Sequence, residues 1–207
     1  GLVDAFVQGM DIHTATAAKV FQVEPEAVDR EMRSKAKAVN FGILYGQGAF
    51  GLAQNLSIPR REAKEIIDAY FEQFAALKAF TAQCVEQVRE KGYAETVLGR
   101  RRYLPDIQSN NATVRAFAER NAVNAPIQGS AADIIKVAMV NIDAALKAKG
   151  LKARMIMQVH DELVFDVPKS ELPELEALIG PAMTDAVTLD VPLAVDMSAG
   201  NDWLEAH

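Results

Sequence analysis

Apolar residues recur every three or four positions through most of residues 1–92, which is the spacing of one face of an α-helix. Helix-start residues and glycines mark the ends of the periodic stretches. We expect helices that begin after Asp11 and near Pro25, a helix over residues 33–45, a helix from Pro59 onward and a helix over residues 77–91. The pattern therefore predicts an entirely helical region over residues 1–92.

The period changes at residue 93, where short apolar runs replace the helical spacing. We then expect, in chain order, a β-hairpin over residues 93–105, long helices over 113–149, a hairpin over 155–167, a helix over 172–187 and a last strand over 192–198. Gly99 lies near the first hairpin turn, while Pro126 and Gly129 predict a kink or break in the long helical stretch. The chain is thus predicted to have an α+β fold, with a mostly helical lobe and a second lobe, residues 93–207, that contains a small antiparallel sheet.

Charge is unevenly distributed along the 207 residues. Residues 1–160 hold 21 of the 22 Lys and Arg and 17 of the 28 Asp and Glu, a net charge of +4. Residues 161–207 hold the remaining 1 and 11, a net charge of −10, so the total is −6. A basic phosphate-binding surface is therefore compatible with the acidic total.

Targeting signals and disulfides are not predicted. No apolar run approaches the roughly 20 residues that cross a bilayer, and the first residues lack the pattern of a signal peptide. Cys84 is the single cysteine, and we expect it to be buried in a helix. These features favour a cytoplasmic protein without a membrane span.

Two adjacent carboxylates lie between two apolar β runs in the segment QVHDELVFDV. Asp161 and Glu162, next to His160, are expected at or beside a hairpin tip. A tight turn often contains Asp, so a solvated turn is an equally good interpretation of these residues alone. Against it, the strongly apolar flanks anchor the hairpin, and carboxylate oxygens are the ligands that Mg²⁺ prefers. Asp161 and Glu162 are therefore candidate metal ligands.

Four residues at steps of four, Arg33, Lys37, Phe41 and Tyr45, share one slowly turning face of a predicted helix. That face is cationic at its start and aromatic at its end. On spacing alone, an amphipathic helix with a solvated basic end is the more common explanation. The chemically specific alternative is a nucleotide site, in which two cations hold a triphosphate while two rings pack against sugar and base.

A second set at steps of four consists of Arg120, Asn124 and Gln128. Long hydrogen-bonding side chains on one helix face suit contact with the DNA minor groove, where acceptors are largely shared among base pairs. A solvated polar face explains the same spacing equally well. His13 is a lone histidine in a predicted helix, which by itself favours a surface or capping role.

The densest basic patch consists of Arg100, Arg101 and Arg102. Because successive strand residues alternate between faces, at most two of these side chains share one side. Phosphate contact is one interpretation, and a solvated strand edge that discourages aggregation is the other.

Taken together, these segments resemble the DNA polymerases of family A, and the resemblance runs the length of the chain. It is carried by DIHTATA (11–17), MRSKAKAVNFGILYG, GRRRYLPDI (99–107), ERNAVNAPIQGSAADI (119–134), QVHDE (158–162) and the ending NDWLEAH. The resemblance implies a right-hand polymerase fold, with residues 1–92 as fingers and residues 93–207 as the C-terminal part of the palm. It also implies a bacterial, nucleoid-associated enzyme of DNA replication or repair.

The resemblance further implies template-directed transfer of deoxynucleotides to a primer 3′-hydroxyl with two Mg²⁺ ions. Asp161 would bind metal, with Glu162 in support. Lys37 would join these two as a catalytic residue, and it would grip the incoming triphosphate together with Arg33 and His13.

The remaining site residues would contact the nucleotide or the DNA. Phe41 would pack near the sugar, and Tyr45 would lie by the nascent base pair. By the same resemblance, the residues that contact primer and template would be Arg120, Asn124, Gln128, His160, Arg100, Arg101 and Arg102.

The family places another catalytic aspartate on a palm strand before the fingers, and residues 1–10 hold no similar motif. We therefore expect this chain to supply half of a two-metal site, to be inactive alone and to need the upstream palm and thumb segment as a partner. A non-catalytic DNA-binding module and one half of a split polymerase remain as alternatives. A nuclease that uses Asp161, Glu162 and Asp166 is less favoured, because strand alternation points Asp166 away from the tip.

Overall fold

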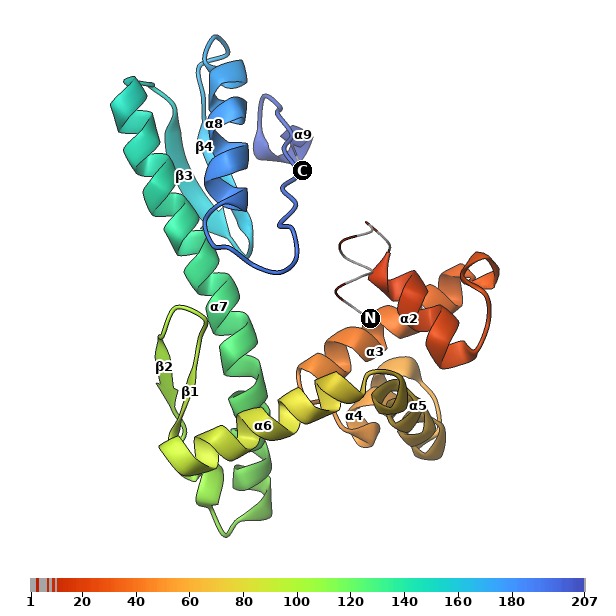
Figure 1. The fold of residues 1–207 in the computed structure, drawn as a ribbon. Helices are drawn as coiled ribbons and strands as arrows, with labels where there is room; N and C mark the ends of the chain where they lie inside the picture. Colours follow the sequence, from red (N-terminus) through yellow and green to blue (C-terminus); the bar gives the residue numbers. More distant parts are fainter. Residues whose placement is uncertain (1–2, 4–6, 8, 10, 207) are drawn as a thin grey trace. The chain divides into compact units, whose positions relative to one another are not determined.

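The computed structural model describes residues 3, 7, 9 and 11–206 of the chain. It forms two compact units, residues 1–129 and 130–207. Most described residues lie in helices, and the described strands form two separate antiparallel pairs, which confirms the predicted α+β fold class (Figure 1). The functional division into fingers and palm after residue 92 stays a prediction.

The first unit is mainly helical. Its elements are α2 (Ile12–Phe21), a 3₁₀ turn (Pro25–Ala27), α3 (Arg30–Leu44), α4 (Ala49–Leu56), α5 (Arg60–Gln73), α6 (Ala75–Lys91), β1 (Tyr93–Glu95), β2 (Arg101–Tyr103), a second 3₁₀ turn (Pro105–Gln108) and the start of α7 (Ala112–Lys149). The second unit contains the end of α7, β3 (Arg154–Val159), β4 (Glu162–Asp166), α8 (Leu172–Thr184) and α9 (Trp203–Ala206).

Side-chain caps set the starts of the two helices that carry the candidate site. Asp11 caps α2 as predicted, and its Oδ1 accepts from the backbone N–H of His13 at 2.9 Å. Asp29 caps α3 through the N–H of Met32 at 2.7 Å, so this helix begins three residues before the predicted start. Pro25 begins only a short 3₁₀ turn, because the Asp29 cap interrupts the helix expected there.

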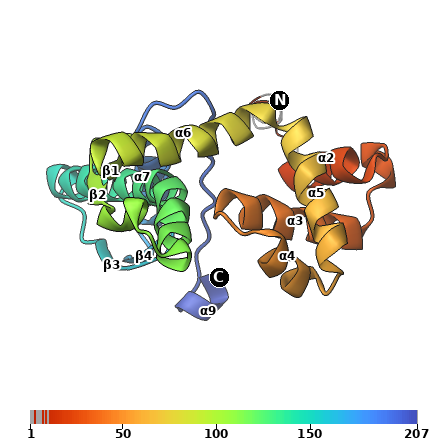
Figure 2. The same cartoon turned by 90° about the horizontal axis from the view of Figure 1, so that it is seen from below.

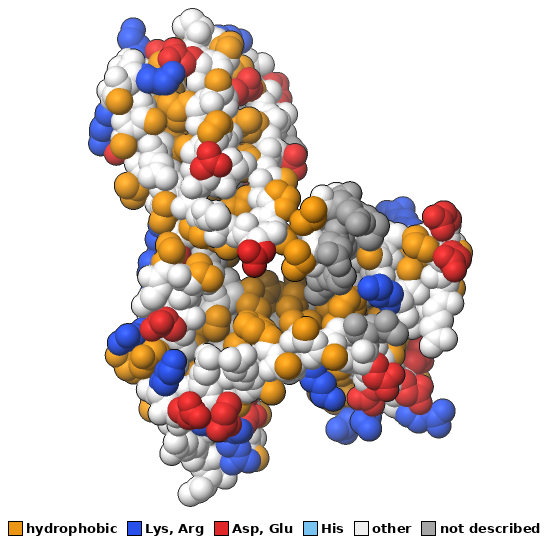
Figure 3. Space-filling model, in the orientation of Figure 1, with side chains coloured by type: hydrophobic (Ala, Val, Ile, Leu, Met, Phe, Trp, Pro, Cys, Tyr) orange, Lys and Arg blue, Asp and Glu red, His pale blue; other side chains and the backbone are white. Residues whose placement is uncertain are grey.

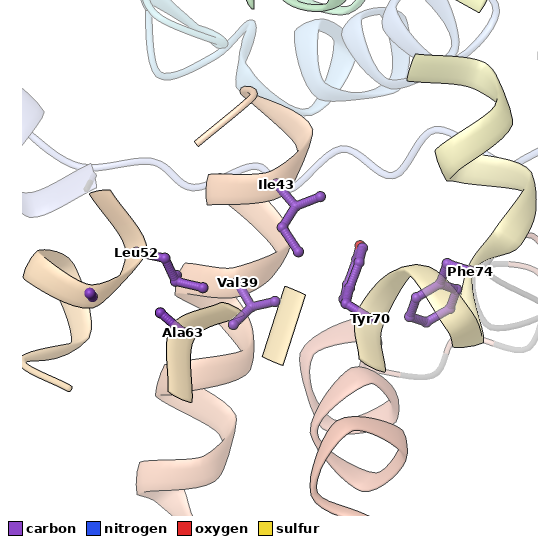
Figure 4. Close-up of a cluster of buried hydrophobic side chains, with 7 residues drawn as sticks. Val39, Ile43, Leu52, Ala63, Tyr70 and Phe74 are labelled. Atoms are coloured by element: carbon purple, nitrogen blue, oxygen red, sulfur yellow. The ribbon is translucent and has the colours of Figure 1, made fainter. Parts of the chain in front are cut away.

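Helices α2 to α5 enclose the first core, which lies beneath the outer face of α3 (Figures 1 and 2). Figure 4 shows Val39 and Ile43 of α3 directed toward Leu52, Ala63, Tyr70 and Phe74. These side chains are almost fully buried, and burial raises the pKa of the Tyr70 hydroxyl to about 12. This core holds α3 firmly, so that its opposite face is presented to solvent.

The β1–β2 hairpin and α7 form a second core in the first unit. The buried side chains are Val88, Ala94, Leu104, Ile107, Ala118, Ala122 and Ala125. The small residues of α7 allow close approach, and a Cβ at Gly129 would lie only 2.6 Å from the Thr96 methyl group. Gly129 is therefore explained by this close contact.

The helix does not break at Pro126 or Gly129, since α7 is one continuous helix that contains Pro126; the alternative expectation of a kink stays a prediction. Proline removes one helix hydrogen bond and crowds the preceding turn, which usually ends a helix. Here the neighbouring residues Ala122 and Ala125 are buried against the hairpin core. Packing of the turn before the proline therefore stabilises the helical backbone through this position.

In the second unit, α7 and α8 pack against the β3–β4 hairpin. The core consists of Ile142, Leu146, Ala153, Leu175 and Ile179. The hairpin register pairs Val159 with Glu162, and an irregularity between Met155 and Met157 shifts the register within β3. This confirms the predicted hairpin and leaves a two-residue turn at its tip.

The predicted last strand over 192–198 is wrong, because no strand is assigned between α8 and α9 in the described chain. Exposure still alternates from residue 191 to residue 196, as in a strand. A strand requires hydrogen bonds to a neighbouring strand, and this segment pairs with none of the described strands. Helix α8 also ends at Thr184, before the predicted residue 187.

Several large apolar side chains are exposed on the second unit, whose visible face shows hydrophobic atoms in orange (Figure 3). They are Val140, Ile156, Met157, Leu189, Met197, Trp203 and Leu204. Within the described residues, the helices contain no apolar stretch long enough to cross a membrane.

Two neighbouring residues of α4 test the first core. Leu52 is buried, whereas Phe50 is exposed. We expect Leu52→Ala to lower the free energy of unfolding by about 3 kcal/mol, because it leaves a cavity under α3. Phe50→Ala is the matched control and should change it by less than about 0.5 kcal/mol. Chemical denaturation measures both, and equal losses would contradict the described orientation of α4.

Candidate functional site

The outer face of α3 carries the predicted cationic and aromatic residues, all of them exposed. The buried face of the helix contains Val39 and Ile43. Phe41 and Tyr45 are 45% and 39% exposed, which is unusual for large aromatic side chains, and their rings stack with centroids 6.2 Å apart. Stacked rings that face solvent offer a flat apolar surface to a planar ligand.

The start of α2 approaches this face and contributes two charged or polar groups. Arg33 Nε donates to Asp11 Oδ2 at 2.6 Å, while the His13 and Phe41 ring centroids lie 5.8 Å apart. The structure therefore brings His13 together with Arg33 and Phe41, although 20 or more residues of sequence separate α2 from this part of α3. The role of each residue in binding stays a prediction.

Electrostatics at the α2–α3 contact favour neutral His13 and ionised Asp11. Burial lowers the pKa of His13; Asp11 opposes this shift, and the positive charges of Arg33 and Lys37 add to it. For Asp11, burial raises the pKa, but the hydrogen bonds from Arg33 and from backbone N–H groups outweigh it and hold the pKa below its usual value. The site thus presents positive charge from α3 beside a neutral imidazole.

Sequence reasoning missed Asn40 and Thr16, two buried polar residues behind His13. Asn40 Nδ2 lies 3.1 Å from His13 Nδ1, and Thr16 Oγ1 donates to Asn40 Oδ1 at 3.1 Å. The sequence did contain a signal for Asn40, since it is a polar residue among the apolar positions of the buried face of α3. A buried amide requires hydrogen-bond partners, so a polar neighbour on another element could have been expected.

A shallow groove of about 520 Å³ runs beside the same face of α3. Lys37, Phe41 and Tyr45 form one side, and Gln47 contributes from the turn after the helix. A Cβ on Gly42 would lie too close to the Gln47 amide oxygen, so a larger residue at position 42 would require the Gln47 side chain to shift away from α3. Three of the four predicted residues therefore line this groove, whereas Arg33 and His13 lie outside its lining.

The C-terminal end of α3 rests on α7 within the first unit. Gly46 has φ +72°, and a Cβ there would lie 2.9 Å from Arg120 Cγ. Asn124 Nδ2 donates to the Tyr45 carbonyl at 3.4 Å. The predicted face of α3 and the second set of residues at steps of four, on α7, thus meet at Tyr45. Arg120 and Asn124 take part in this contact, whereas no described contact joins Gln128 to Tyr45.

The three consecutive arginines do not form one uniform cationic patch. Arg101 donates to Glu95 at 2.9 Å and lies 4.6 Å above the Tyr93 ring. Arg102 is paired across the strands with Ala94, so alternation places its side chain on the opposite face from Arg101. Arg100 precedes β2 in the turn, where its N–H donates to Thr96.

The hairpin of the second unit carries the predicted carboxylates. His160 and Asp161 form the two-residue turn, and Glu162 begins β4. His160 has φ +52°, a left-handed conformation that costs energy for a residue other than glycine, and Gln158 Nε2 donates to its carbonyl at 2.5 Å. Asp166 lies four residues along β4 from Glu162, roughly 13 Å away at strand spacing.

The described residues contain no cluster of three or more His, Cys, Asp or Glu able to hold a metal ion. Asp161 and Glu162 are therefore at most part of a metal site within this part of the chain. The distance of Asp166 from the tip argues against a metal site built from these three residues.

Comparison with known proteins identifies relatives over the whole chain. The family model described as DNA polymerase family A matches residues 1–205. DNA polymerase I of Streptococcus pneumoniae (strain TIGR4) is 52% identical over 206 residues, covering 99% of this chain and 24% of the relative. DNA polymerase I of Bacillus subtilis (strain 168) is 52% identical over 205 residues, covering 99% of this chain and 23% of the relative.

A solved structure of the POL domain of Pol1 from M. smegmatis, in complex with DNA primer-template and dNTP, has a TM-score of 0.95 and 49% identity. The match covers 100% of this chain and 36% of that one. The chain spans about a quarter of the length of the curated relatives it matches.

Substitutions of Asp11 separate its capping role from its ion pair with Arg33. Asn caps helices as well as Asp does, so Asp11→Asn keeps the cap and removes the charge. We expect Asp11→Ala to lower the free energy of unfolding by about 1 kcal/mol. Asp11→Asn should lower it by only a few tenths of a kcal/mol, roughly, because both partners of the ion pair are partly exposed.

The pH dependence of the free energy of unfolding, compared between the parent and Asp11→Asn, tests whether the charge of Asp11 stabilises the fold. Because the pKa of Asp11 is lowered in the folded chain, its charge stabilises the fold above the ordinary aspartate pKa. The difference between parent and Asp11→Asn should therefore shrink as the pH falls below about 4. A difference that grows on acidification would contradict the ion pair.

Proposed function

Since the chain belongs to DNA polymerase family A, we propose that the outer face of α3 binds an incoming deoxynucleoside triphosphate for template-directed extension of a DNA primer. One observation carries this proposal: Arg33 and Lys37 stand at one end of an exposed face whose other end is the Phe41–Tyr45 stack, and His13 of α2 lies near both cations and beside the Phe41 ring. The cationic end of the face suits the triphosphate, and the aromatic end suits the sugar and base, so the order of groups along the face matches the order of parts in a nucleotide.

The chemistry of each group fits one part of that ligand. Lys37 supplies a point charge to the triphosphate, and the guanidinium of Arg33 keeps donors free of its Nε bond to Asp11. Phe41 offers an apolar ring to the sugar, and Tyr45 offers a second ring to the base. These residues bind and orient the nucleotide, which makes the α-phosphorus accessible to the primer.

Magnesium would be held in part by Asp161 and Glu162, whose carboxylate oxygens are ligands of the right kind. When bound, two Mg²⁺ ions neutralise the charge that develops on the attacking and leaving oxygens. The paired strands β3 and β4 place Asp161 in the two-residue turn at their tip. The two carboxylates at the tip complete only part of a two-metal site, so further ligands must come from another segment of the polymerase.

Primer and template would contact the groups outside the triphosphate site. The residues proposed for this role are Arg120, Asn124, Gln128, His160, Arg100, Arg101 and Arg102. Support comes from the M. smegmatis Pol1 relative, whose structure contains DNA primer-template and dNTP. Asn124 already holds the Tyr45 carbonyl, so a duplex at this position would lie directly beside the nucleotide site.

A second candidate function is a DNA-binding module without catalysis. It is favoured by the incomplete carboxylate set in the described residues. The two candidates differ in one outcome: the module binds primer–template but never extends it, even when the rest of a family A polymerase is supplied.

Two lysines of α3 test the triphosphate site. Lys37 lies on the proposed binding face, whereas Lys35 forms an ion pair with Glu31 on the other side of the helix. We expect Lys37→Ala to weaken dTTP binding about tenfold, the effect of losing one charge-assisted contact. Lys35→Ala removes the same charge from the same helix and should leave the affinity nearly unchanged. Isothermal titration at low salt measures both, and equal weakening would contradict a site on this face.

Extension is tested in a chimera in which this chain replaces the matching 205 residues of B. subtilis DNA polymerase I. We expect primer extension with Mg²⁺ by the parent chimera. Asp161→Asn should abolish it, because the metal-binding charge is lost. Asp166→Asn, at the other end of β4, is the matched control and should keep most of the activity.

The chimera also separates the two candidate functions. DNA binding without extension by the folded parent chimera would favour the non-catalytic module. Equal extension by the Asp161→Asn and parent chimeras would show that the hairpin tip does not serve the reaction.

A further inference from the structure

Two of the most deeply buried polar side chains of the first unit stand in a line behind His13. Thr16 is 0% exposed and Asn40 is 4% exposed. They come from different helices, α2 and α3, and lie 24 residues apart in the chain. Burying an amide and a hydroxyl is costly unless both are hydrogen-bonded, so their partners determine what this pair does.

The hydrogen bonds in this line have a fixed direction. The Asn40 amide has its oxygen toward Thr16, whose hydroxyl donates to Oδ1 at 3.1 Å. The Asn40 NH₂ group therefore faces His13 Nδ1, also at 3.1 Å. An amide NH₂ can only donate, so Nδ1 must accept and carries no proton. In a neutral ring, the proton is then on Nε2.

The surroundings of the ring favour its neutral form, in which the position of the single proton decides what Nε2 can do. Burial lowers the pKa of His13, the positive charges of Arg33 and Lys37 add to this shift, and the negative charge of Asp11 opposes it. A neutral imidazole with Nε2–H donates a hydrogen bond from Nε2. The other tautomer would present a lone pair there and would repel a phosphate oxygen.

We propose that Asn40, oriented by Thr16, is a positioning residue that holds His13 in the Nε2–H tautomer, and that His13 thereby donates a hydrogen bond to the triphosphate. The second half of this statement rests on the proposed nucleotide site. The first half concerns the chain without a ligand and stands on one buried and one partly buried hydrogen bond. Neither Thr16 nor Asn40 touches the nucleotide in this arrangement.

Two substitutions of Thr16 separate orientation from packing. Thr16→Val keeps the side-chain shape and removes the hydroxyl, so Asn40 is free to turn its amide around. Thr16→Ser keeps the hydroxyl and removes a buried methyl group. A packing role predicts that Ser is the more harmful change, whereas the proposed orienting role predicts that Val is.

The tautomer is read by ¹⁵N NMR of the imidazole rings at a pH where His13 is neutral. The chain has only three histidines, and His160 on the exposed hairpin tip is the internal reference. We expect Nε2–H at His13 in the parent and in Thr16→Ser, and a mixture of tautomers in Thr16→Val. Asn40→Asp replaces the donor with an acceptor and should place a proton on Nδ1. Nδ1–H in the parent, or unchanged Nε2–H in Thr16→Val, would overturn the proposal.

The link to the ligand is tested with dTTP as the probe. We expect Thr16→Val to weaken dTTP binding about tenfold, as for the loss of one hydrogen bond to a charged group, and Thr16→Ser to bind like the parent. Equal affinity of parent and Thr16→Val would refute the donation from His13. If the parent itself does not bind dTTP, the nucleotide site fails, while the ¹⁵N spectra still decide whether Asn40 sets the tautomer.

Discussion

The packing of α2 against α3 is the constraint on which the proposed site depends, because the site draws residues from both helices. Asp11 caps α2 and at the same time binds Arg33 of α3. Behind this ion pair, hydrogen bonds of the buried Asn40 side chain join α3 to Thr16 and His13 of α2. The contact between α2 and α3 therefore orients the Arg33 guanidinium and the His13 imidazole before any ligand binds. Such preorganisation lowers the entropic cost of ordering these side chains on binding.

The other end of α3 is held differently, by close backbone contact. Gly46 lies against Arg120, and Asn124 binds the Tyr45 carbonyl, so the aromatic end of the face is fixed on α7. Both ends of the helix are thus restrained, while the outer face stays open. In the second unit, the left-handed turn at His160 serves a similar purpose, since the anchored β3–β4 pair presents Asp161 at its tip.

Much of this was predictable from sequence wherever the signal is local. Helical spacing gave the faces of α3 and α7, and the apolar runs gave both hairpins. Asn40 was missed because its partner His13 lies 27 residues away, and only the tertiary fold reveals it. The helix continues through Pro126 because tertiary packing of the preceding turn outweighs the local tendency of proline to end a helix. The apolar alternation near the C-terminal end describes an extended segment, but a strand also needs a neighbour to pair with.

The central claim is that one exposed face binds a nucleotide with its phosphates at the His13 end and its base at the Tyr45 end. Backbone amide shifts in an ¹⁵N-labelled chain test it most directly, with inorganic tripolyphosphate compared against dTTP. The account predicts that both ligands shift signals around His13, Arg33 and Lys37, and that only dTTP also shifts those of Phe41 and Tyr45. Identical shift patterns for the two ligands, or changes confined to other helices, would contradict it.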